Sequence, residues 1–272
     1  MDERIWFALG VALALLSAAW AAYALGAGRS QHTQWNNGLL FLAWLSISLF
    51  LSERGRHIGH CPITNLFETV VFLDWSLLLT YLVIGTAYRV SVLGAFTAPV
   101  VAGTGFFALA APIDVPRFLP NLGWALELHA SFSLLAYGAL GLAAVSSVLY
   151  LVQERQLKGH QLRQWFYRLP AMGDLARIQR RMLVWGFFLL TLGLAAGGMV
   201  TESSGVGRAG ADWVKIVWSA IIWALYLHLV LSPTLFGFGA RRVAWCSVGS
   251  YVFILLTFWG IDSLSHVHRF SS

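Results

Sequence analysis

Eight long apolar segments divide the chain, and short polar stretches separate them. Most of these segments have about the 20 residues that a helix needs to cross the hydrocarbon core of a bilayer. The pattern therefore predicts an all-α, polytopic membrane protein with about eight transmembrane helices, in a single membrane domain that covers residues 1–272. The predicted spans are residues 5–26, 36–52, 66–86, 91–111, 124–152, 184–201, 214–232 and 243–263.

Composition agrees with this class. Hydrophobic residues make up 58% of the 272 residues and charged residues only 11%, against roughly 25% charged in soluble domains. The first apolar run, residues 5–25, exceeds the roughly 7 to 15 residues of a signal-peptide core, so we expect it to remain as a spanning helix. Cys61 and Cys246 lack the spacing of a thiol oxidoreductase or of a covalent haem attachment motif. We attribute the net charge of +6 to the membrane topology, so we do not expect the protein to bind nucleic acid.

The distribution of charge predicts an orientation. Segment 154–181 is rich in Lys and Arg, so the positive-inside bias places it in the cytoplasm. Eight spans then place both termini outside. Arg54 and Arg56 fall on the outer side as well, where basic residues are usually depleted. Either a span is misplaced, or these cations are kept to pair with an anionic ligand.

Histidines gather at the predicted outer face. His129 lies about one and a half turns into the fifth span, His268 follows the eighth span, and His60 comes just before the third. Imidazole ligates haem iron and arginine pairs with propionates, whereas a divalent metal would need more carboxylates than the outer loops offer. Chance also produces histidine pairs at one face. The candidate haem contacts of the outer site are His60, His129, His268, Arg54, Arg56 and Arg269.

A further histidine, His228, lies well inside the seventh span, roughly 20 to 25 Å from the outer end of that helix. It shares a helical stripe with Trp213, so this stripe could receive a flat ligand, although such a histidine could also bond a neighbouring carbonyl. No other histidine is predicted at this depth. Asp74, in the third span, indicates a hydrogen-bonding or proton site, and Gly193 with Gly197 in the sixth indicates close helix packing.

Five segments in order resemble the cytochrome c assembly family of CcsA or ResC type, which is similar to HemX-like and YpjD-like proteins. Residues 59–69, GHCPITNLFET, resemble the family's GHFPLSNLYES, and residues 218–228, WSAIIWALYLH, resemble WSLITW…YLH. The three other segments are Leu128-His129 with Tyr137, Leu169-Pro170 with Asp174-Leu175, and Gly260-Ile-Asp262 through Val267-His268.

The resemblance implies a haem-translocating component of c-type cytochrome biogenesis in the bacterial cytoplasmic (inner) membrane, which carries haem b to the extracytoplasmic face and is not an enzyme by itself. It also implies that His129 and His268 are external axial ligands and that His228 belongs to a transmembrane haem site near Trp218. The sequence does not supply a second axial ligand for His228, which leaves a partner subunit, a non-histidine ligand or an empty site. The implied partners are a ResB/CcsB-like membrane subunit and apocytochrome c.

One departure opens an alternative. The family's haem-presenting signature, WGxxWxWDPKE, should lie just before Trp218, but only Lys215 and Trp218 match it and Ile216 replaces the glutamate. HemX-like relatives have a similarly reduced signature, so the alternative is a membrane regulator or scaffold of haem biosynthesis that binds a haem-pathway enzyme. A solute or proton transporter would need acidic residues within spans, and only Glu68 and Asp74 are candidates.

Overall fold

The computed structural model describes residues 3–26, 33–63, 65–88, 91–114, 124–159, 170–203 and 213–267. These residues form helices and their connections, without strands, which confirms the all-α prediction. Seven of the helices are long and apolar enough, over their described residues, to cross a membrane. The helices are α1 (Arg4–Gly26), α2 (Thr33–Ile58), α3 (Leu66–Tyr88), α4 (Ser91–Ala110), α5 (Trp124–Lys158), α6 (Met172–Ser203), α7 (Trp213–Leu235) and α8 (Ala240–Val267).

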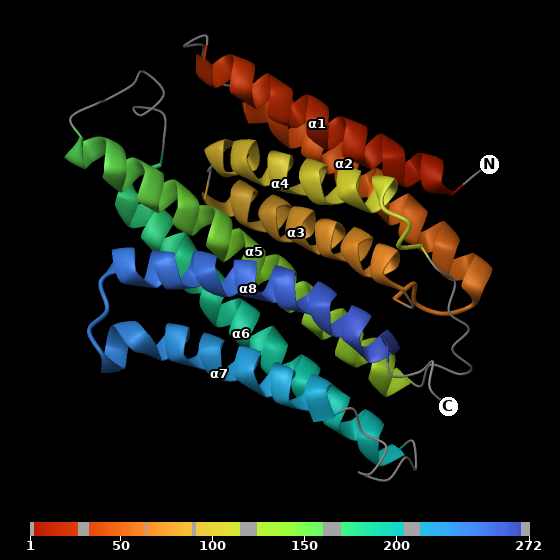
Figure 1. Ribbon diagram of the computed structural model, residues 1–272. Helices are drawn as coiled ribbons and strands as arrows, with labels where there is room; N and C mark the ends of the chain where they lie inside the picture. The colour runs from red at the N-terminus through yellow and green to blue at the C-terminus, as the bar shows by residue number, and fades with distance from the viewer. Residues whose placement is uncertain are drawn as a thin grey trace.

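The helices run alternately up and down one bundle (Figure 1). Helices α1, α3, α5 and α7 begin at the end of the bundle where the chain begins, and α2, α4, α6 and α8 end there. We call this the terminal end and the other the opposite end. The end of α5 and the start of α6, which hold the described residues of segment 154–181, lie at the opposite end, whereas the start of α1 and the end of α8 lie at the terminal end. This alternation agrees with an even number of crossings.

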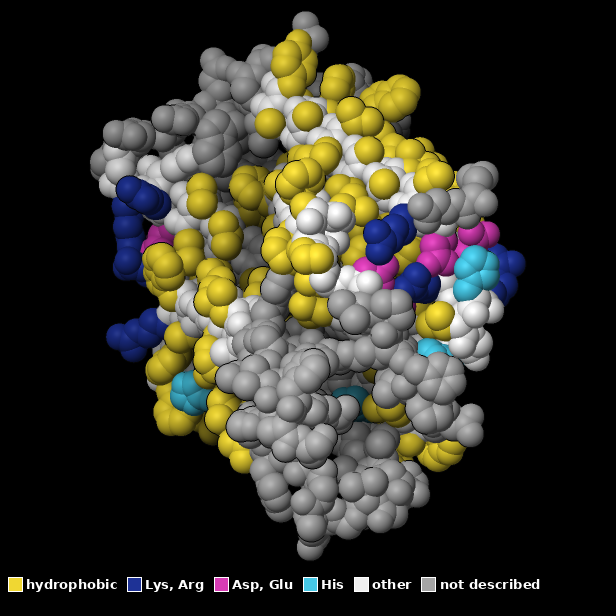
Figure 2. Space-filling view, turned by 45° about the vertical axis from the view of Figure 1, so that its right-hand side comes forward, with side chains coloured by type: hydrophobic (Ala, Val, Ile, Leu, Met, Phe, Trp, Pro, Cys, Tyr) yellow, Lys and Arg dark blue, Asp and Glu magenta, His cyan; other side chains and the backbone are white. Residues whose placement is uncertain are grey.

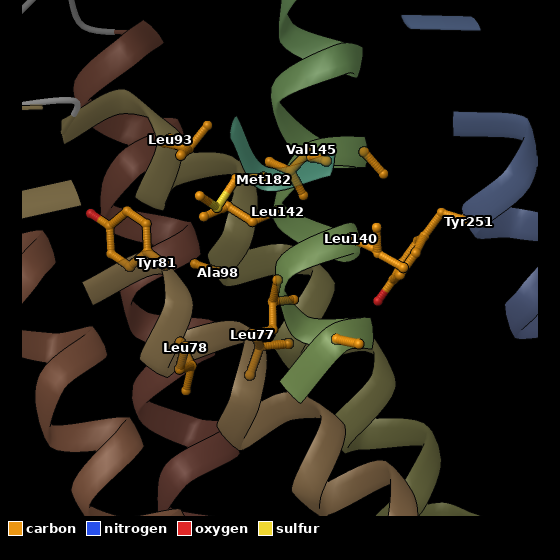
Figure 3. Packing of buried hydrophobic residues seen from close by; sticks show 14 of the residues in the cluster. Leu77, Leu78, Tyr81, Leu93, Ala98, Leu140, Leu142, Val145, Met182 and Tyr251 are labelled. Atoms are coloured by element: carbon orange, nitrogen blue, oxygen red, sulfur yellow. The ribbon is translucent and has the colours of Figure 1, made fainter. Parts of the chain in front are cut away.

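Two groups of four helices make up the bundle. Helices α1 to α4 pack on one another, α5 to α8 form the second group, and α3 with α5 joins them. Gly138 of α5 permits this junction, because a Cβ there would lie 2.0 Å from Ser76 Oγ and 2.7 Å from the Ser76 main-chain carbon of α3. Around the junction, buried side chains of α3, α4, α5 and α8 fill the core, with Leu140 and Tyr251 close together (Figure 3).

Three helices extend by six residues or more beyond the predicted spans. Helix α2 continues past residue 52 to Ile58, α5 continues past residue 152, and α6 begins at Met172 instead of residue 184. In the early part of α6 the apolar side chains that recur every three or four residues are buried, and the arginines between them are exposed. Ser146 Oγ of α5 also donates a 2.9 Å hydrogen bond to the carbonyl of Leu175. An amphipathic helix thus replaces part of what the sequence pattern indicated as a polar loop.

Candidate functional site

His129 is fixed against the backbone of a neighbouring helix. It lies near the start of α5, is half-buried, and its Nδ1 is 2.7 Å from the main-chain carbonyl oxygen of Gly193 in α6. A carbonyl oxygen only accepts, so Nδ1 carries the hydrogen and donates it. In the neutral ring this leaves the lone pair on Nε2, which is the tautomer that ligates a metal ion through Nε2.

The two glycines of the G-x-x-x-G pair make room for this imidazole. A Cβ on Gly197 would lie 2.7 Å from His129 Nδ1 and 3.0 Å from its Cε1, and a Cβ on Gly193 would lie 2.6 Å from Ser133 Oγ. Close helix packing is what the sequence pattern predicted for these glycines. The structure adds a specific consequence, because the side chains that occupy the space come from the start of α5 and include the candidate ligand.

The connection between α2 and α3 is attached to the same stretch of α5. Gly59 turns the chain with a φ of 77°, in the left-handed region that glycine adopts without steric cost. The main-chain N–H of Cys61 then donates a long hydrogen bond, 3.4 Å, to Oε1 of Glu127, two residues before His129. His60 is half-buried, with Nδ1 3.1 Å from the carbonyl of Cys61, so Nδ1 of His60 also carries the hydrogen.

Burial raises the pKa of the Cys61 thiol, and the carboxylates of Glu127 and Glu68 raise it further. All three effects disfavour the negatively charged thiolate, which is the nucleophilic and metal-binding form. The environment of Cys61 is therefore unlike that of a reactive cysteine.

Arg54 is the centre of an ion-pair network at the terminal end. Its Nε lies 2.8 Å from Oε1 of Glu68 in α3, its Nη2 lies 2.9 Å from Oδ1 of Asp114, and its Nη1 pairs with Glu3. Arg4 also pairs with Asp114. The Arg54 side chain is only 16% exposed and each of its nitrogens has a carboxylate partner. Because every nitrogen of the Arg54 guanidinium already pairs with a carboxylate of this chain, these ion pairs do not fit the propionate contact predicted for Arg54.

Arg56 has a different environment. Its side chain is 74% exposed, and its ion pair with Glu53 is long, at 3.8 Å. It therefore stays a candidate contact for an anionic group. Figure 2 shows the mixture of acidic, basic and histidine side chains at one end of the molecule, whereas the cluster at the other end is mainly basic.

His228 lies at another depth from His129. Trp223 of α7 donates a 3.0 Å hydrogen bond from Nε1 to Thr191 Oγ1 of α6, which sets these two residues level. His228 follows Trp223 by about 7 Å of helix toward the opposite end, and Gly193, which holds His129, lies on the terminal side of Thr191. The structure thus keeps the two histidines apart, as the depth argument from sequence expected.

The His228 side chain is exposed and has aromatic neighbours. The ring centroids of Phe236 and Phe238 lie 5.3 Å and 5.8 Å from that of the imidazole. Trp218, ten residues earlier on α7, donates from Nε1 to Thr257 Oγ1 of α8 at 2.9 Å, which ties these helices together. Nothing in the sequence pattern indicated that the connection between α7 and α8 supplies the aromatic neighbours of His228.

Three predicted site residues fall wholly or partly outside the description. His268 and Arg269 lie outside the described residues, so the expected approach of His268 to His129 stays a prediction. The backbone of Trp213 begins α7, but its side chain is not described. The backbone of α8 ends at Val267, beside α5 and at the end of the bundle where α5 begins. Within the described residues, no group of three or more His, Cys, Asp or Glu side chains could hold a metal ion.

Comparison with known proteins finds relatives that share one name. Proteins named cytochrome c biogenesis protein CcsA are similar to the chain over most of their length. The one from Guillardia theta is 26% identical over 254 residues, covering 84% of this chain and 82% of the relative. That from Porphyra purpurea is 25% identical over 271 residues, with 83% of each covered. That from Synechococcus sp. (strain CC9311) is 27% identical over 262 residues, covering 83% of this chain and 84% of the relative.

The sequence profile described as cytochrome C assembly protein matches residues 63–268, which is more than half of the chain. This range contains His129, the residues Gly193 and Gly197 of α6 against which it packs, and α7 with His228. It also contains α3 and its partners on α5, and thus the junction of the two helix groups. The chain therefore belongs to the cytochrome C assembly protein family.

Proposed function

We propose that this protein is a haem-binding, haem-translocating component of c-type cytochrome biogenesis, and that His129 is a ligand of haem at the terminal end. Membership of the cytochrome C assembly protein family and the names of the CcsA relatives support the role in cytochrome c biogenesis. The observation that carries the haem site is the orientation of the His129 imidazole, whose Nδ1 is bonded to the Gly193 carbonyl while Nε2 keeps its lone pair.

The residues around His129 fit this role. A hydrogen bond from Nδ1 to a carbonyl fixes the orientation and the tautomer of the ring, which is the usual arrangement of a metal-ligating histidine. One turn deeper, the enclosed Ser133 hydroxyl has no hydrogen-bond partner among the described residues, so it can bond a polar group brought by a ligand. We expect His268 to supply the other axial ligand, and Arg56 and Arg269 to pair with the propionates.

His228 belongs, in this proposal, to a second haem site nearer the opposite end. The exposed imidazole beside Phe236 and Phe238 offers an aromatic, apolar surface to a flat ligand. His57, His60 and His129 all lie toward the terminal end, so none of these described histidines can share the site. We therefore expect a ResB/CcsB-like membrane subunit to supply the second axial ligand.

The experiment is an absorption spectrum of the purified full-length protein with a pyridine haemochrome assay, which identifies haem b. We expect haem absorption in the wild type and its loss or shift in His129→Gly, with partial recovery when imidazole is added. His57→Ala is the matched control, because His57 is exposed and bonded only to Glu3 among the described residues. Wild-type haem absorption that neither His129→Ala nor His268→Ala alters would overturn the terminal site.

A regulator or scaffold of haem biosynthesis is the second candidate. The N-terminal part of α6 supports it, because this helix presents exposed Arg177, Arg180 and Arg181 at the opposite end, where an acidic enzyme surface could bind. The two functions differ in one outcome. A scaffold would keep its function in cells that carry His129→Ala and lose it when these three arginines become glutamine, and a haem-translocating protein would show the reverse.

We further propose that the terminal end faces outside a bacterial cytoplasmic membrane, as the positive-inside bias requires for the basic opposite end. Reporter fusions test this orientation. A fusion after Ser272 should report the extracytoplasmic side, and one next to Lys158 the cytoplasmic side. Equal reports from both positions would contradict the topology, and reversed reports would contradict the orientation alone.

A further inference from the structure

A groove of about 420 Å³ lies between the last turns of α5 and the first turns of α8, at the opposite end of the bundle. Its walls are apolar and come from both helices. They consist of Val148, Leu151, Val152, Trp245 and Val248. Val148 and Trp245 are exposed, at 39% and 59%, so the groove opens on the side of the bundle that faces the lipid.

Charged side chains form the rim of this groove, and they are mainly cations. Arg155, Lys158 and Arg241 lie around a single carboxylate, that of Glu154. Glu154 bonds Lys158 at 2.7 Å and Arg241 at 3.4 Å, one partner for each carboxylate oxygen. Arg155 has no carboxylate partner among the described residues. The rim therefore carries a surplus of two positive charges.

These two features select the chemistry of an occupant. The surplus cations favour an anion, and the guanidinium groups of Arg155 and Arg241 suit a phosphate. A free phosphate would leave the valine and leucine walls without an apolar partner. An acyl chain covers such walls, and Trp245 lies where aromatic residues usually mark the boundary between headgroups and hydrocarbon. The occupant should therefore have an anionic head and a hydrocarbon chain in one molecule.

We propose that this groove binds one anionic phospholipid, with its phosphate at Arg155 and Arg241 and an acyl chain between α5 and α8. Basic pockets between transmembrane helices are a known mode of anionic lipid recognition. The site is separate from both candidate haem sites, because neither His129 nor His228 lines the groove. Its test is accordingly independent of the function proposed above.

The experiment measures lipid binding to the full-length protein in detergent by native mass spectrometry. Dioleoyl phosphatidylglycerol is compared with dioleoyl phosphatidylcholine, and glycerol phosphate is added as the free headgroup. We expect phosphatidylglycerol to bind tightly, phosphatidylcholine weakly and glycerol phosphate not to compete. The double variant Arg155→Gln/Arg241→Gln should bind phosphatidylglycerol roughly 10- to 30-fold more weakly, since each basic residue near a membrane surface contributes about 1 kcal/mol.

Two further variants separate a built site from general attraction of lipid to a basic surface. Arg177→Gln/Arg180→Gln removes two exposed charges at the same end but outside the groove, and should leave binding nearly unchanged. Val248→Phe keeps every charge but fills the groove, and should weaken binding. Equal losses from the two arginine pairs, equal binding of both lipids, or full binding by Val248→Phe would each overturn the proposal. Circular dichroism establishes that each variant is folded.

Discussion

The two ends of the bundle use basic residues in different ways. At the terminal end Arg54 is enclosed by carboxylates from the residue before α1, from α3 and from the segment after α4, so its charge is neutralised within the fold. At the opposite end, on the rim of the groove between α5 and α8, Lys158 and Arg241 share the carboxylate of Glu154, Arg155 has no carboxylate partner among the described residues, and all three cations are exposed. An arginine that is paired with carboxylates of the protein connects the elements that carry them, whereas exposed cations without such partners can orient the protein in a membrane and bind an external anion.

The largest expected effect comes from Arg54→Ala. This change would remove the Arg54 guanidinium from Glu68, which is 1% exposed, and from Asp114, which keeps only Arg4 as a cation partner among the described residues, and breaking a buried pair in this way costs about 3–5 kcal/mol. Arg56→Ala, two residues along the same helix, should change the free energy of unfolding by no more than about 0.5 kcal/mol because Arg56 is exposed. Thermal unfolding in detergent measures both. A similar, small effect of the two changes would mean that the terminal end is no more tightly bound by charge than the opposite end.

A smaller effect should follow from Gly197→Ala, which tests the packing of the terminal half of α5 on α6. The added methyl group would overlap the His129 imidazole, and overpacking of this kind costs about 1–3 kcal/mol. The neighbouring Gly198→Ala adds its methyl group in open space, and should instead stabilise the helix by up to about 1 kcal/mol. The comparison is made by thermal unfolding and by the haem spectrum, and we expect only Gly197→Ala to alter the latter. The distinctive outcome is that Gly197→Ala lowers and Gly198→Ala raises the stability against thermal unfolding.

The reactivity of Cys61 provides a pH test of the carboxylates at the terminal end. Its raised pKa means that the thiolate forms only at a pH above that of an ordinary thiol, so the rate of alkylation by N-ethylmaleimide should rise later with pH than that of glutathione. Glu127→Gln removes a nearby negative charge, so it should move the rate profile of Cys61 to lower pH. A Cys246→Ser background restricts the reaction to Cys61. An unchanged profile in Glu127→Gln would show that this carboxylate does not face the thiol.

The smallest expected effect lies between the two ends. Asp74 is buried in α3, with Oδ1 2.5 Å from Thr104 Oγ1 of α4 and with Oδ2 unpartnered among the described residues. Asn has the same shape and can keep the bond to Thr104, so Asp74→Asn should change stability by about 1 kcal/mol or less. Asp74→Leu loses the bond and should cost more. If Asp74→Asn abolished function in cells while leaving the fold and the haem spectrum intact, a proton-transfer role would become the better interpretation.

The sequence predicted the helices better than the contacts between them. An apolar run of about 20 residues is enough to indicate a span, so each of the eight predicted spans corresponds to a helix, and seven of these helices are long and apolar enough over their described residues to cross a membrane. The early part of α6 was missed because a span-length criterion ignores amphipathic helix outside the bilayer, although the spacing of Leu175, Ile178 and Met182 contained the signal. Helix boundaries and surface helices need periodicity as well as hydropathy.

The contacts of Arg54 could have been approached from sequence, but only in part. The predicted topology placed Glu3, Glu68 and Asp114 on the same side as Arg54, which was enough to suggest internal pairing. Choosing between these carboxylates and a ligand required the packing of α1 to α4. The packing of His129 on α6 was harder still to predict, because the contact of its ring with Gly197 depends on the register between two helices, and a single sequence does not specify that register.

The bond between His129 and Gly193 has a consequence for sequence variation. Its acceptor is a main-chain oxygen, so no exchange of a side chain removes that acceptor, and the identity of residue 193 reports nothing about the bond itself. A shift of α6 by one residue along its axis, however, would turn the carbonyl by about 100° around the helix and carry it away from the imidazole. The hydrogen bond of His129 therefore does not depend on which side chain stands at position 193, although the space for the ring depends on Gly197, and insertions or deletions that rotate α6 would break the bond.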